Sequence, residues 1–248
     1  MTLWRLEVLR LTRTNRWLIL VGIFGFFGLL GPVTARYMGE IMSRFGGDIQ
    51  FTLPEPAPLD GIVQYLSNAG QIGLLAVVVV AAAALAVDAR PEAAAFYRTR
   101  VPEARTILLP RYVVTTAAAA VAFVLGMALA WAGTVWLIGG LPAVEVLIGT
   151  LLGALYLAFA VAVVAAMASV TRTVVTTVFA ALAILLMLPV LGLLGAVKPW
   201  LPSELVGAPT SILAGVPPGE FTRAVVVTVV VTVALLALAA SRQSVREL

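Results

Sequence analysis

Six apolar stretches, each long enough to cross a bilayer, constrain this chain more than any other feature. No charged residue occurs between Arg16 and Arg36, from 69 to 87, or from 112 to 144. About 20 helical residues cover the ~30 Å hydrocarbon core of a bilayer. Only 11% of the residues are charged, whereas soluble domains carry about 25%. We therefore expect an all-α integral membrane protein that forms a single transmembrane domain over 1–248, with six transmembrane helices at about 17–35, 69–87, 112–138, 146–169, 174–197 and 224–240.

The N-terminal stretch 2–16 has the pattern of a helix lying in the membrane interface. At helical spacing, Trp4 and Val8 fall on one face, while Arg10, Arg13 and Arg16 fall near another. Trp favours headgroup depth and Arg reaches lipid phosphates. The alternative is that these residues are the ordinary basic flank of the first span.

Small residues mark surfaces for close helix packing. Gly22, Gly25, Gly28 and Gly31 recur every three residues in the first span, and Gly149 and Gly153 form a small-xxx-small pair in the fourth. Such residues let helix backbones approach each other in a bilayer. They predict packing and not a binding site.

The basic segment 88–111 stands out between the second and third spans. It contains five Arg residues, and Pro91 precedes a favourable helix start at Glu92. We expect a short helix along the membrane face that presents Phe96, Tyr97 and Arg98 to a partner outside the membrane. The alternative is a solvated basic loop that only follows the positive-inside rule.

The distribution of basic residues predicts the orientation. Six spans place both termini on one side. The segments on that side contain twelve of the sixteen basic residues, and the other side contains Arg36, Arg44, Lys198 and Arg223. Cytoplasmic segments carry the excess of Lys and Arg. We therefore expect a multi-pass protein of the plasma or inner membrane with cytoplasmic termini.

The Pro-rich segment 198–223 then lies on the outer side. We expect two short helices there, broken by Pro209 and by Pro217–Pro218.

The amino-acid composition disfavours several classes of chemistry. The chain has no Cys and no His, which removes thiolate chemistry and the commonest ligands of zinc, copper and haem. No charged residue lies in the middle of a span, as proton relays and ion-coupled carriers normally require. Lys198 is the only Lys and is followed by Pro, so a phosphate-binding loop of the P-loop type is impossible. We expect no catalytic, metal or cofactor site in this chain, and any uphill transport must draw energy from a partner.

This layout resembles the type 2 permeases of ATP-binding-cassette transporters, mostly exporters in bacteria. Members have an interfacial helix, six spans, a cytoplasmic coupling helix between spans two and three, and short outer helices between spans five and six. Residues 2–16, 88–111 and 198–223 occupy those three places. Glu92, Pro102–Arg105 and Arg111 match the coupling-loop pattern, while Ala94–Ala95 depart from its usual Gly-Thr.

The resemblance implies a dimer of permeases, each docked on a cytoplasmic ATPase subunit that binds ATP and Mg. The uncharged spans favour export of an amphiphilic or hydrophobic substrate such as a lipid, drug or peptide. Besides its subunits, the chain would contact membrane lipid, and no nucleic-acid partner is expected. The expected docking residues are Glu92, Phe96, Tyr97, Arg98, Pro102, Arg105 and Arg172.

Two other functions compete with this one. The chain could be a membrane scaffold or assembly factor that docks a cytoplasmic partner without transport. It could also be a lipid-modifying enzyme, but the spans offer only scattered hydroxyls such as Thr150 and Ser169, which usually bond their own helix.

Overall fold

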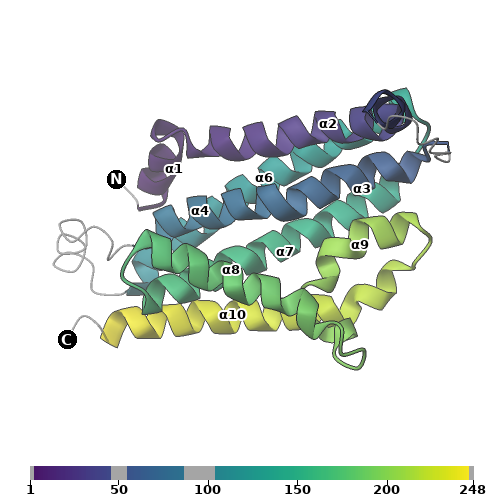
Figure 1. The fold of residues 1–248 in the computed structure, drawn as a ribbon. Coiled ribbons are helices and arrows are strands. Elements are labelled where there is room, and N and C mark those ends of the chain that lie inside the picture. The colour runs from purple at the N-terminus through teal and green to yellow at the C-terminus, as the bar shows by residue number, and fades with distance from the viewer. Residues whose placement is uncertain (1–2, 46–54, 87–103, 246–248) are drawn as a thin grey trace.

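The structure is a computed structural model that describes residues 3–45, 55–86 and 104–245. Within these ranges all regular structure is helical, and six helical segments are long and apolar enough to span a membrane. This confirms the expected all-α membrane fold (Figure 1). The elements are α1 (Leu3–Arg13), α2 (Arg16–Phe45), α3 (Pro58–Asn68), π-helix η1 (Ala69–Gly73), α4 (Leu74–Leu85), α6 (Ala104–Leu137), α7 (Ala143–Val170), α8 (Val174–Leu191), 3-10 helix η3 (Lys198–Trp200), α9 (Glu204–Leu213), 3-10 helix η4 (Pro218–Phe221) and α10 (Thr222–Val245).

Helix α7 forms the centre of the bundle. It contacts α4, α6, α8, α9 and α10, and it is the most buried of the six spans. Its middle, from Ala160 to Ala166, consists only of Ala and Val, all of them buried. These short side chains let five neighbouring helices approach one axis closely.

The two ends of the bundle differ in what they carry. Helix α1, the turn between α7 and α8, and the last turns of α10 lie together at one end, called here the α1 end (Figure 1). Helix α9, the end of α2 and the start of α3 lie toward the other, called the α9 end. Both termini therefore lie at the same end, as six spans require.

The second span begins eleven residues earlier than expected, at Pro58. Pro58 fits the first helical position because its missing N–H would be unpaired there. The Asp60 carboxylate accepts a 2.8 Å hydrogen bond from the Ala57 N–H, which satisfies a donor at the helix start and suits the helix dipole. Ile62 and Tyr65 are fully buried, so the polar-looking segment before Ala69 contributes to the core.

The third span also begins earlier, because α6 starts at Ala104 and not near Tyr112. The last eight residues of the basic segment 88–111 thus form the first two turns of α6. The part of that segment before α6, residues 88–103, is called the connector below. Leu108 is buried and Arg111 is only 3% exposed. Contacts with neighbouring helices therefore bury Leu108 and Arg111 of this charged stretch in the bundle.

The segment between α8 and α10 contains short helices, as expected, but Pro209 does not break them. Helix α9 continues through Pro209. A Cβ at Gly149 would lie 2.5 Å from the Cα of Pro209. This close backbone approach anchors α9 against the first turns of α7. Pro217, whose backbone is extended, does separate the helical segments and directly precedes η4.

A buried hydrogen bond joins the second span to the third. The Tyr65 hydroxyl donates to the Phe123 carbonyl oxygen at 2.9 Å, and the two rings stack with centroids 6.0 Å apart. We expect Tyr65→Phe to keep the ring packing and to lower the free energy of unfolding by about 1 kcal/mol. Denaturant unfolding of the purified protein in micelles measures this difference. Thr210→Val, which removes a hydroxyl bonded only to its own helix, is the matched control and should change stability less.

Candidate functional site

The expected partner-docking residues lie at the α1 end or outside the described residues. Glu92, Phe96, Tyr97, Arg98 and Pro102 lie outside them, as does most of the expected coupling helix. Arg105, in the first turn of α6, and Arg172, in the turn between α7 and α8, are both exposed. Both therefore present a guanidinium at the end of the bundle where the termini lie (Figure 1).

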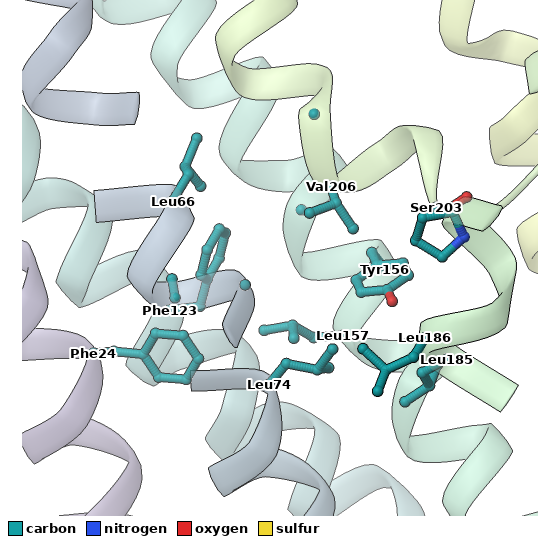
Figure 2. A pocket seen from close by; sticks show the side chains of 15 residues that line it. Phe24, Leu66, Leu74, Phe123, Tyr156, Leu157, Leu185, Leu186, Ser203 and Val206 are labelled. Atoms are coloured by element: carbon teal, nitrogen blue, oxygen red, sulfur yellow. The ribbon is translucent and has the colours of Figure 1, made fainter. Parts of the chain in front are cut away.

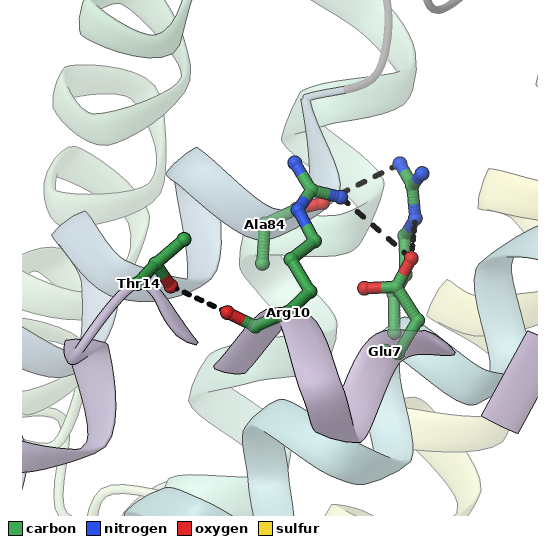
Figure 3. Close-up of polar contacts among 5 residues, drawn as sticks. Glu7, Arg10, Thr14 and Ala84 are labelled. Atoms are coloured by element: carbon green, nitrogen blue, oxygen red, sulfur yellow. Dashed lines mark hydrogen bonds and ion pairs between the residues drawn. The ribbon is translucent and has the colours of Figure 1, made fainter. Parts of the chain in front are cut away.

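A buried ion pair lies next to the connector and was not among the expected site residues. The Arg111 Nε donates to Glu7 Oε1 at 2.9 Å, and the two side chains are 3% and 8% exposed. Arg10 Nη1 lies 3.6 Å from the same carboxylate oxygen. The Glu7 carboxylate thus contacts two guanidinium groups, one from its own helix and one from α6 (Figure 3).

This ion pair brings together the helices on both sides of the connector. Arg111 Nη1 also lies 3.5 Å from the carbonyl oxygen of Ala84, near the end of α4. Helix α1 is therefore fixed by charge-assisted contacts to α6, and through Arg111 to α4. A movement of α4 or α6 would therefore act on α1 as well.

Local sequence offers only a weak signal for this pair. Glu7 is the only acidic residue in 2–16, and its spacing from Arg10 predicts a pairing within the helix. The Arg111 partner is 104 residues away. Nothing in local sequence specifies that contact.

A second feature is an apolar cavity of about 330 Å³ at mid-length of the bundle. It lies where η1 interrupts the second span, between eleven residues of α3 and twelve of α4. Figure 2 shows Phe24 and Leu66 on one side of it and Leu186 and Ser203 on the other. Its walls are Phe24, Leu66, Ala69, Gly70, Leu74, Phe123, Gly153, Tyr156, Leu157, Leu185, Leu186, Pro189, Ser203, Val206 and Gly207.

The π-helix shapes one wall of this cavity. A π-turn inserts one extra residue into a helix, and such turns occur frequently at functional sites. Here the turn places Gly73 against the ring of Phe24, where a Cβ would lie 2.7 Å from the ring edge. Phe24 in turn meets Phe123 edge-on, with centroids 5.7 Å apart. Gly70 faces open space instead, and a Cβ there would meet nothing closer than Val206 at 4.0 Å.

The cavity is suited to binding apolar groups and not to acid–base chemistry. No charged residue lines it, and the described residues contain no cluster of His, Cys, Asp or Glu suited to a metal ion. The Ser203 hydroxyl is buried and has no hydrogen-bond partner among the described residues. Thr150 and Ser169 bond carbonyls of their own helix, as expected.

Comparisons with protein-family models, with curated proteins and with solved structures found no match for this chain.

Proposed function

We propose that this chain is the membrane permease subunit of an ATP-binding-cassette exporter that moves an amphiphilic or hydrophobic substrate. The observation that carries the proposal is the buried contact of Glu7 with Arg111, which joins the interfacial helix α1 to the helices that flank the connector. A permease driven by a soluble partner needs its docking segment mechanically coupled to the spans. The expected topology, with cytoplasmic termini, is part of the proposal and places the connector on the ATPase side.

In this proposal the connector docks into an ATPase subunit, which binds ATP and Mg. Phe96 and Tyr97 fill an apolar pocket of the partner, as aromatic anchors do at interfaces. Glu92 and Arg98 pair with opposite charges on it, and the exposed Arg105 and Arg172 add contacts at the rim. Closure of two ATPases would push the connectors of two permease copies, either identical or related.

Glu92→Arg tests this coupling. Reversing the charge should leave membrane insertion intact but remove stimulation of the partner's ATPase by the permease, because an attractive contact becomes repulsive. ATP hydrolysis and substrate efflux are measured together in reconstituted vesicles. Glu55→Arg, a reversal placed well away from the connector, is the control. Efflux by the Glu92→Arg protein at the level of the unmodified protein would remove Glu92 from the coupling contact.

A further inference from the structure

The cavity at mid-length of the bundle is open on one side to the surface of the protein. Its floor consists of buried side chains, among them Phe24, Phe123 and Leu157, whereas Leu186 in its wall is 64% exposed. Pro189 and Gly207, also in its wall, are exposed. The π-helix η1 lies in the middle of the segment Pro58–Leu85, which is long and apolar enough to span a membrane. An opening at this level falls within hydrocarbon when that segment spans a bilayer.

The position of the opening restricts the ligand. A molecule that reaches the cavity at this depth must be soluble in the hydrocarbon region, because polar groups are costly there. A volume of about 330 Å³ lies at the lower limit of ligand-binding cavities, which are about 300–1,000 Å³. The apolar side chains that line an empty cavity have no atoms to contact on that side and lack those dispersion contacts. An acyl chain that enters from the bilayer would supply them.

Polar atoms contribute little to the walls of the cavity. Ser203 lines the cavity just before α9, but its hydroxyl oxygen is buried in the protein and has no partner among the described residues. The walls that a ligand can contact are therefore almost entirely apolar, which suits an acyl chain.

We propose that the cavity is a binding site for one acyl chain of a membrane lipid, entered sideways between η1 and the α8–α9 corner. The chain packs on Phe24 and Phe123 and extends toward Leu74 and Leu157. Binding at this site does not require ATP or a partner. A test of this lipid site therefore gives a result that is independent of the transport function proposed above.

Photo-cross-linking tests the site. The full-length protein is reconstituted in phosphatidylcholine vesicles that contain a trace of phosphatidylcholine with a diazirine in the middle of one acyl chain. After illumination, the labelled residues are identified by peptide mass spectrometry. We expect labels on cavity residues such as Leu157 and Val206, in addition to labels on lipid-facing residues such as Phe26, which is 59% exposed.

Two variants fill the cavity from different walls. Gly70→Phe projects a ring into space that is open, and Val206→Trp fills the same volume from α9. Both should lose the cavity labels and keep the label at Phe26. Gly22→Phe introduces the same side chain at an exposed glycine with nothing within 4 Å and should keep the cavity labels. Absence of cavity labels in the unmodified protein, or their persistence in both filled variants, would overturn the proposal.

Discussion

Replacing Glu7 by Ala is expected to lower the free energy of unfolding by about 3 kcal/mol, since removing one partner of a buried ion pair leaves a buried charge poorly compensated. Arg111 is 3% exposed and would lose the carboxylate that lies 2.9 Å from its Nε. Helix α1 would lose its charged contact with α6. Denaturant titration of the purified protein in micelles, followed by circular dichroism, measures the loss.

Two controls separate the ion pair from general effects of lost charge. Glu220→Ala removes an exposed carboxylate and should change stability by less than about 0.5 kcal/mol. Glu7→Met combined with Arg111→Met replaces both charges by apolar chains, which is often close to neutral for a buried pair. The double variant should therefore be more stable than Glu7→Ala alone. Equal stability of Glu7→Ala and Glu220→Ala would show that the pair does not hold α1.

Gly28→Ala is expected to disrupt the contact between α2 and α6. A Cβ at Gly28 would overlap the carbonyl oxygen of Gly126 on the facing helix. The Cβ is held rigidly by the backbone of α2 and the atom it meets belongs to the backbone of α6. The helices must therefore separate, and overpacking of this kind costs about 1–3 kcal/mol. The same unfolding titration measures the effect.

Gly22→Ala is the matched control on the same helix. A Cβ there would meet nothing within 4 Å, so the substitution should be neutral or slightly stabilising because Ala has the higher helix propensity. Both substitutions raise the helix propensity by the same amount. The difference between the unfolding free energies of the two variants therefore reports the packing contact alone. A Gly28→Ala protein as stable as Gly22→Ala would contradict the close approach of α2 and α6.

The six spans and the helical conformation of α1 could be predicted because they depend on local properties. A run without charge, about as long as the bilayer is thick, has few alternatives to a transmembrane helix. The start of the second span was harder to predict. Asp60 and Gln64 give the segment before Ala69 a polar appearance, yet its other face carries Ile62 and Tyr65, which are fully buried.

The glycine pattern shows a second limit. A step of three residues turns a helix by about 300°, so glycines at that spacing drift around the axis. Gly28 faces Gly126 and Gly31 faces the backbone near Tyr65, whereas Gly22 faces open space. Similarly, Gly149 receives the backbone of α9, and Gly153 receives the ring of Phe123. Which glycines pack depends on neighbouring helices that local sequence does not specify.

The two candidate sites arise from tertiary structure. The pairing of Glu7 with Arg111 requires α1 to fold back onto α6. The cavity requires residues from α2, α3, α4, α6, α7, α8 and α9 together with the π-turn. Of the expected docking residues, Arg105 and Arg172 are exposed at the α1 end, and the role of all seven stays a prediction.

Gentle extraction of the tagged protein from its native host, with identification of what co-purifies, tests the proposed function most directly. The permease proposal predicts a stoichiometric ATPase subunit that is lost when Phe96 and Tyr97 are both replaced by Ala. Trp4→Ala combined with Trp17→Ala, which changes exposed aromatic residues elsewhere, should retain that subunit. Recovery of the chain alone, or only with proteins that are not ATPases, would contradict the proposal and favour a membrane scaffold.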